Sequence, residues 1–312
     1  MNYGLLKVQP HFVEKIWGGN ISERWYNVSS PNKPIGEIWS VCATQQVTNF
    51  LPEVDLSLDQ WLRQNPDQYP TTFNELPFRI SIIDAKEDLS VQVHPTDEYA
   101  EIIGLPSGLS EAWLIIEADP HARIQLGHKA HTKEELTEKI ENNQWNELLN
   151  YLPVSTDDVF FIEAGTMHAI GKGILVYEIS QATDCTYRIY DYDRIDPTTN
   201  LKRELHIGHA LNVLTVGDIG DHKITGQCSD FGSYRLYELI RSRFFDVNKI
   251  EVVESADIPL KTWGFLTVTS SSGMINGVQA RAGDTFLVSN DQRSVFIEGS
   301  LTCMFASEGK SI

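Results

Sequence analysis

The sequence is short of positive charge: 25 lysines and arginines stand against 43 aspartates and glutamates, a formal net charge of −18. Such an excess of carboxylates repels nucleic-acid phosphates and anionic membranes, so we expect neither as a partner. The start of the chain has no basic region followed by an apolar run, and no apolar stretch approaches the roughly 20 residues of a membrane span. We therefore expect a cytoplasmic protein, in which any phosphorylated small molecule must find a local basic pocket.

Cysteine is equally scarce. The four cysteines, at positions 42, 185, 228 and 303, lie far apart and form neither a CxxC pair nor any other metal-finger spacing. We expect reduced, packed thiols.

What the sequence does contain is a β pattern. With 312 residues and 41% apolar side chains it can bury the core of two domains or of one large β-rich unit. Short apolar runs separated by Gly, Pro, Asn and Asp turns predict strands at 78–83, 89–94, 112–116, 159–162 and 174–179. The pattern favours a β-sandwich or barrel.

Helical patches interrupt the strands. The clearest begins with Thr132 three residues before Glu135, a capping-box spacing, and predicts a small helical insertion around 132–150, with Leu148 and Leu149 on its apolar face. A shorter patch repeats the spacing with Ser57 and Gln60, and a third covers 206–214.

Part of the chain is repeated. Laid without gaps on the stretch from Asp284, the stretch from Asp158 matches at Phe160 with Phe286, Gly173 with Gly299 and Leu175 with Leu301. At the same offset Ser294 stands opposite His168, and no histidine follows position 222. We therefore predict two related β-barrels, with metal bound only by the first: residues 1–235 as the metal-binding catalytic domain and 236–312 as a domain without metal ligands.

The segment 89–95 carries the first metal-ligand candidates. Side chains two apart on a strand share a face, so Ser90, Gln92 and His94 point together. Pro95 favours an extended His94 and the next residues resemble a helix start, which places the imidazole at the rim of a barrel.

Two more candidates lie further along the chain. Glu111 opens the apolar strand 112–116, a costly place for a carboxylate unless a cation or an arginine receives it. His168 follows the turn 164–167 between two apolar strands. Two imidazoles with carboxylate and amide oxygens fit Zn²⁺, although Mn²⁺, Fe²⁺ or Co²⁺ would tolerate the same set. Singly, each residue could be an ordinary core histidine, strand glutamine or surface carboxylate; together they favour a metal.

The chain resembles the type I mannose-6-phosphate isomerase family in its short bacterial form. The resemblance rests on four strings, KIWGG at 15–19, GEIW at 36–39, LSVQVHP at 89–95 and TYRIYDYDR at 186–194, and spans nearly the whole chain. It implies a mainly β protein of two cupin-like barrels (jelly rolls) that acts on a sugar phosphate. It also implies one Zn²⁺ per chain, with ligands that fall on Gln92, His94, Glu111 and His168. We expect a monomer or a homodimer.

The same resemblance implies further site residues. The family's catalytic arginine and the acidic residue four before it fall on Arg188 and Asp184. The family's other pocket residues fall on Trp17, Glu37, Ser90 and Arg194. The implied activity interconverts mannose 6-phosphate and fructose 6-phosphate through an enediolate, with Arg188 stabilising its charge and Asp184 orienting Arg188.

One position departs from the family pattern. Most members have a lysine two residues before the ligand glutamate, where this chain has Leu109. The proton carrier is therefore open between Glu37, a metal-bound water, Lys86 and Lys172. The departure also raises an alternative: a non-catalytic cupin that keeps the metal and senses a sugar phosphate.

Overall fold

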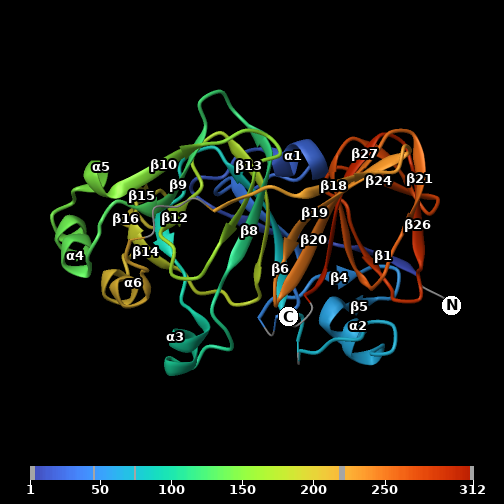
Figure 1. Cartoon of the computed structure of the whole chain (residues 1–312), viewed down its shortest axis with the longest axis horizontal. Coiled ribbons are helices and arrows are strands. Elements are labelled where there is room, and N and C mark those ends of the chain that lie inside the picture. The colour runs from blue at the N-terminus through green and yellow to red at the C-terminus, as the bar shows by residue number, and fades with distance from the viewer. Residues whose placement is uncertain (1–3, 45, 74, 218–221, 310–312) are drawn as a thin grey trace.

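The computed structural model describes residues 4–44, 46–73, 75–217 and 222–309. Strands dominate it and form two units that lie side by side along the long axis of the molecule (Figure 1). The expected mainly β architecture is confirmed. In the described part of the chain, no helix has both the length and the apolar character needed to cross a membrane.

The first unit pairs a seven-stranded with a five-stranded sheet, and all the strand pairs in both are antiparallel. In spatial order the larger sheet contains β17 (Lys223–Ile224), β11 (Val159–Ile162), β8 (Glu111–Ala118), β13 (Ile174–Gln181), β6 (Phe78–Ala85), β3 (Ile35–Val41) and β2 (His11–Glu14). The smaller contains β10 (Leu149–Pro153), β9 (Arg123–His128), β12 (His168–Ala169), β7 (Val91–Val93) and β14 (Tyr187–Tyr190).

The second unit has the same two-sheet plan. Its larger sheet contains β1 (Leu5–Val8), β25 (Thr285–Val288), β22 (Gly264–Ser270), β27 (Leu301–Glu308), β20 (Phe245–Val252), β19 (Tyr234–Arg241) and β18 (Gln227–Asp230). Its smaller sheet contains β21 (Ser255–Pro259), β26 (Ser294–Glu298), β23 (Ser272–Ile275) and β24 (Val278–Arg281). The domain boundary expected at 235/236 falls inside β19, and the N-terminal strand β1 pairs with β25 of this second unit.

Short elements decorate the sheets. They are the hairpins β4 (Phe50–Leu51) with β5 (Leu56–Ser57) and β15 (Ile195–Asp196) with β16 (Leu201–Lys202), and the helices α1 (Ile21–Tyr26), α2 (Leu58–Gln64), α3 (Asp97–Ile102), α4 (Lys133–Glu141), α5 (Trp145–Leu148) and α6 (Ile207–Val213). The Thr132 hydroxyl caps α4 by accepting the Glu135 N–H at 3.1 Å, as its spacing predicts. Leu149, expected on a helix face, instead begins β10.

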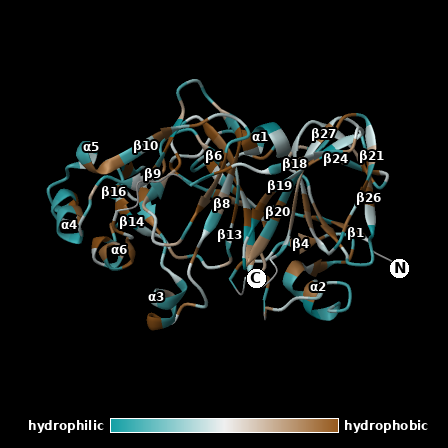
Figure 2. Cartoon of the chain, in the orientation of Figure 1, coloured by the Kyte–Doolittle hydropathy of each residue, from teal (hydrophilic) through white to brown (hydrophobic). Residues whose placement is uncertain are grey.

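Alternation along β6 gives its sheet two different faces. Phe78, Ile80 and Ile82 point into a large core that also contains Phe265 and Ala306 of the second unit. The Phe78 and Phe265 rings meet edge to face, 6.0 Å apart. Figure 2 shows the hydrophobic residues concentrated on strands such as β6 and β20 in the middle of the molecule. The odd-numbered residues of β6 point the other way, into the first unit, and this leaves one face of the sheet available for a site.

The predicted repeat has matching local structure. Gly173 and Gly299 both have positive φ angles, 77° and 106°, in the turns before β13 and β27. Such angles favour glycine in both turns. His168 is the first residue of β12, and Ser294, its counterpart in the repeat, is the first residue of β26.

Candidate active site

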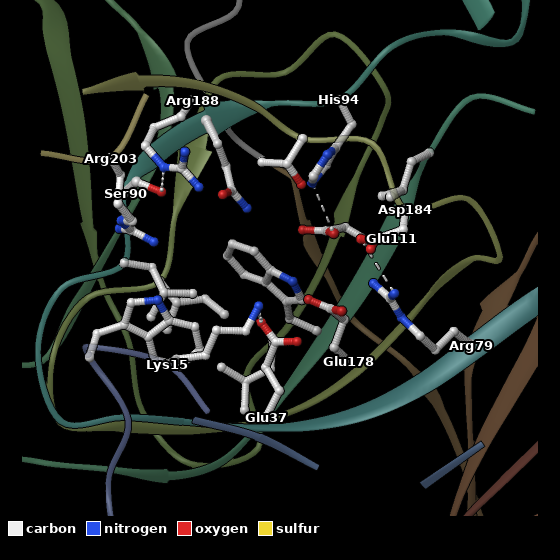
Figure 3. Close-up of a pocket in the computed structure, with 18 residues that line it drawn as sticks. Lys15, Glu37, Arg79, Ser90, His94, Glu111, Glu178, Asp184, Arg188 and Arg203 are labelled. Atoms are coloured by element: carbon white, nitrogen blue, oxygen red, sulfur yellow. Dashed lines mark hydrogen bonds and ion pairs between the residues drawn. The ribbon is translucent and has the colours of Figure 1, made fainter. Parts of the chain in front are cut away.

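The candidate site is a pocket between the two sheets of the first unit (Figure 3). Strand register brings three candidates together on the smaller sheet, because Gln92 on β7 lies opposite His168 on β12 and opposite Arg188 on β14. His94 directly follows β7, and Glu111 is the first residue of β8 on the larger sheet. Both sheets therefore contribute side chains to the pocket.

His94, Glu111 and His168 converge on one point. One ligand atom from each lies within 4.8 Å of the others, and all three side chains are buried. His94 Nε2 is 3.4 Å from Glu111 Oε2, and His168 Nε2 is 3.5 Å from Glu111 Oε1. These are the three charged or imidazole ligands predicted from the sequence.

Hydrogen bonds fix which nitrogen of each imidazole faces the carboxylate. His94 Nδ1 is 2.9 Å from the backbone oxygen of Cys185, and His168 Nδ1 is 2.9 Å from that of Thr166. Because a carbonyl oxygen can only accept, both Nδ1 atoms donate, and in the neutral ring the Nε2 lone pair then points inward. This is the tautomer that a metal ligand requires.

The pKa shifts of His168 and Glu111 leave a neutral imidazole and an ionised carboxylate near pH 7. Burial lowers the pKa of His168 to about 4, so this ring is neutral near pH 7. Burial alone would raise the pKa of Glu111, but the two imidazoles outweigh it and hold that pKa below its ordinary value. Among the residues that the structure describes, none forms a hydrogen bond with the buried Oε1 of Glu111. An ionised carboxylate and two imidazole nitrogens that converge on one buried point are a donor set that suits a divalent metal, so these residues fit one.

Gln92 can supply a fourth ligand. Its Nε2 lies 3.4 Å from His168 Nε2. Rotating the amide by 180° exchanges its nitrogen and oxygen, which presents the oxygen that a cation prefers.

Two charged residues that sequence reasoning missed lie on the same face of the larger sheet. Arg79 on β6 and Glu111 on β8 both stand opposite Ser180 of β13, one on each side, and Glu178 lies two residues from Ser180 on the same face. Both Arg79 and Glu178 are buried and line the pocket. Burial and the neighbouring Glu111 carboxylate raise the pKa of Glu178 well above its ordinary value.

Glu37 and Lys15 form the wall of the pocket opposite the smaller sheet. Lys15 Nζ lies 2.8 Å from Glu37 Oε1, and the Trp39 indole donates to Glu37 Oε2 at 2.9 Å. Burial opposes ionisation, but the Lys15 ammonium outweighs it and lowers the pKa of Glu37. Glu37 is thus a paired anion, poorly suited to pick up a proton. Neither Lys86 nor Lys172 is among the residues that line the pocket.

Arginines gather at the opposite end. Arg188 Nε donates to Ser90 Oγ at 3.3 Å, and its Nη1 donates to the backbone oxygen of Glu204 at 2.9 Å. Arg203, which the sequence did not single out, also lines this end, and its Nε donates to the buried Asp191 carboxylate at 2.8 Å. Burial and the neighbouring Arg203 lower the pKa of Arg188, as expected where cations outnumber anions.

The structure brings most of the sequence-predicted residues together. Those lining the pocket are Trp17, Glu37, Ser90, Gln92, His94, Glu111, Asp184 and Arg188. Arg194 does not line it, because its guanidinium is bonded to Asp191 and to the backbone oxygen of Asp88. Asp184 forms its ion pair with Arg79, Nη1 to Oδ1 at 3.6 Å, and not with Arg188.

Comparisons with known proteins identify the family of this chain. Residues 5–144 match the family model for the catalytic domain of type I phosphomannose isomerase. A Bacillus subtilis protein described as a probable mannose-6-phosphate isomerase is 36% identical over 310 residues, which cover 96% of this chain and 97% of that protein. The crystal structure of the mannose 6-phosphate isomerase from Bacillus subtilis has a TM-score of 0.91 and 28% identity, covering 97% of this chain and 99% of that one. A zinc-bound mannose 6-phosphate isomerase has the same fold at 13% identity, with a TM-score of 0.77 and coverage of 98% and 100%. The chain belongs to the type I phosphomannose isomerase family.

Proposed function

We propose that this protein is a zinc-dependent isomerase that interconverts mannose 6-phosphate and fructose 6-phosphate. The observation that carries the proposal is the buried group of His94, Glu111 and His168, of which His94 and Glu111 line a pocket that also contains three arginines. Near full-length similarity to proteins described as mannose-6-phosphate isomerases supports the substrate.

Gln92, His94, Glu111 and His168 would hold the zinc ion. When bound there it supplies a Lewis acid beside the carbonyl end of the open-chain sugar. The two backbone carbonyls that accept from the imidazoles keep both rings in the tautomer this requires.

The arginine end suits the 6-phosphate. Arg188 and Arg203 lie there with the Ser90 hydroxyl, and Ser90 is two residues from Gln92 on the same strand face, roughly 7 Å away. A sugar bound with its reacting carbons at the histidines would thus extend its phosphate towards the guanidinium groups. This is the local basic pocket that a protein of charge −18 needs for a phosphorylated ligand.

Glu178 is the residue best placed to carry the proton. Isomerisation moves the proton on C2 of the open-chain aldose to C1, and one carboxylate on one side of the sugar can accept it and return it. Glu178 lines the pocket, and its raised pKa brings its proton affinity closer to neutrality than that of an ordinary carboxyl. Leu109, Trp113 and Ile83 form apolar parts of the same lining, which limits the water that could exchange with the proton.

A coupled assay tests the proposal. Purified protein is incubated with mannose 6-phosphate, and fructose 6-phosphate formation is followed before chelation, after chelation and after addition of Zn²⁺. We expect activity that chelation abolishes and Zn²⁺ restores. A zinc-loaded protein that binds the sugar phosphate but never exchanges its C2 proton with solvent would instead be a sensor.

Removing the Arg203 guanidinium should weaken substrate binding. Charge-assisted hydrogen bonds contribute about 1.5–3 kcal/mol, so Arg203→Met is expected to raise KM for mannose 6-phosphate roughly 10- to 100-fold, with a smaller effect on kcat. The matched control is Lys202→Met, because Lys202 is the preceding residue but its side chain is 62% exposed and paired with Asp193. Equal KM values for the two variants would remove Arg203 from the phosphate end.

A further inference from the structure

Leu109 leaves one wall of the pocket without charge. Its side chain is buried and lines the pocket two residues before Glu111, where the family pattern leads one to expect a lysine. An isobutyl group can neither donate a hydrogen bond nor balance a developing anion. The charge that isomerisation generates on the sugar oxygens must therefore be met by another side chain.

Arg79 is a buried cation whose hydrogen-bonding capacity is incompletely used. The residue is 9% exposed, its guanidinium lies 4.7 Å from the ring of Trp39, and its ion pair with Asp184 is long, at 3.6 Å. Within the described part of the chain its Nε is buried without a hydrogen-bond partner. A guanidinium has five N–H donors and burial makes unused donors costly, so this side chain is set to receive a ligand.

The other pocket cations either lie at the phosphate end or are paired with a carboxylate. Arg188 donates to Ser90 and Glu204, Arg203 donates to Asp191, and Lys15 pairs with Glu37. In Figure 3 Arg188 and Arg203 lie together at one end, whereas Arg79 lies on the far side, next to Glu111 and Asp184.

Strand register places Arg79 close to the metal ligands. Arg79 and Glu111 flank Ser180 from β6 and β8, two strand spacings apart, so their Cα atoms are separated by roughly 10 Å. Arg79 lines the same pocket as His94 and Glu111, beside which the reacting carbons would lie. The carboxylates around it outweigh burial and raise the pKa of Arg79, so it remains charged.

We propose that Arg79 is a catalytic residue which donates hydrogen bonds to the oxygens on C1 and C2 as negative charge develops there, filling the role that Leu109 cannot. The inference rests on the proposed isomerase function. The arginines then have separate roles. Arg79 stabilises the enediolate, the role that the sequence led us to expect for Arg188, and Arg188 binds the phosphate together with Arg203. Because arginine stays protonated, Arg79 supplies charge but carries no proton.

Two ligands separate this role from simple substrate binding. The zinc-loaded Arg79→Met variant is titrated calorimetrically with the hydroxamic acid of 5-phosphoarabinonic acid, which copies the enediolate, and with sorbitol 6-phosphate, which cannot form one. We expect kcat to fall about 10²- to 10³-fold and hydroxamate affinity to fall by a similar factor, while sorbitol 6-phosphate affinity changes less than about threefold. Equal weakening of both ligands, or a kcat within threefold of wild type, would overturn the proposal. Arg79→Lys keeps the charge but loses the planar guanidinium with its paired donors, so its kcat and its hydroxamate affinity should lie between those of the wild type and those of Arg79→Met. It replaces the methionine variant if that variant folds poorly.

A swap with position 109 gives a second readout. Leu109→Lys should gain less than about threefold in kcat when Arg79 is present but at least about tenfold in the Arg79→Met background, because one cation suffices. If Leu109→Lys changed kcat by the same factor in both backgrounds, a lysine at position 109 and Arg79 would not serve the same role. Arg123→Met is the matched control, since Arg123 also stacks on an aromatic ring, that of Tyr151, but lies outside the pocket lining. An inactive wild-type protein would refute the isomerase function itself. An active protein whose kcat does not change in Arg79→Met would refute only the role of Arg79.

Discussion

Replacing Glu111 with glutamine is expected to abolish stoichiometric zinc binding and to lower kcat on the order of 10⁴-fold, about 5.5 kcal/mol of barrier. Glutamine has the same shape but lacks the charge that offsets a divalent cation. Elemental analysis of the dialysed protein measures the first effect and the coupled assay the second.

Stability distinguishes a lost ligand from general damage. In the metal-free protein the neighbouring imidazoles hold the pKa of Glu111 below its ordinary value, so its charge stabilises the fold and the neutral variant should unfold at a somewhat lower temperature than the metal-free wild type. Zinc should raise the melting temperature of the wild type but not that of the variant. Glu117→Gln, on the same strand but with a side chain 51% exposed, is the control and should behave as wild type. One zinc per chain in Glu111→Gln would remove Glu111 from the ligand set.

Replacing Glu178 with glutamine should lower kcat by about 10³-fold while leaving zinc content and sorbitol 6-phosphate affinity close to wild type, because general acid–base groups typically contribute 10²- to 10⁴-fold. Exchange of the C2 proton with solvent deuterium should fall in parallel, which NMR of fructose 6-phosphate formed in D₂O measures. Retention of more than a tenth of the wild-type exchange would show that another group carries the proton.

The pH profile of the same variant adds an independent check. Burial and the Glu111 carboxylate raise the pKa of Glu178, and only its ionised form can accept a proton. The kcat of the wild type should therefore fall as pH decreases through that raised pKa, since the group becomes protonated, and should recover as pH increases. Residual activity of Glu178→Gln should lack this limb.

Residues placed by strand alternation could be predicted from the sequence. Gln92 and His94 needed only the period of two along 89–95, and Glu111 needed only the cost of a carboxylate at the start of an apolar strand. The structure brings these three into the lining of one pocket and places the predicted His168 directly beside them.

Arg79 and Glu178 also line the pocket but were not predicted as site residues. Each is a charged residue between two apolar or aromatic neighbours inside a strand, FRISIIDA in β6 and ILVYEISQ in β13, so each carries the signal that singled out Glu111. Their partnership with Asp184 and Glu111, by contrast, depends on strand order, which one sequence does not provide.

Arg203 had no comparable signal. It lies in irregular chain between β16 and α6, where charged residues are ordinarily solvated, and it reaches the pocket because the buried Asp191 accepts its hydrogen bonds. The sequence also could not show which strands share a sheet, because β1 joins a sheet formed by residues more than 200 positions later.

The shared core between the two units limits how this protein can be divided or recombined. The face of β6 opposite Arg79 packs against Phe265 and its neighbours in the second unit. The strand that carries Arg79 therefore also contributes side chains to the core between the two units. A fragment ending near residue 235 would expose Phe78, Ile80 and Ile82 to water and lose the partners of β1. The second unit, with Ser294 where the first has a histidine, therefore covers the core face of the strand that carries Arg79, and a truncation that removes it is expected to destabilise the site as well.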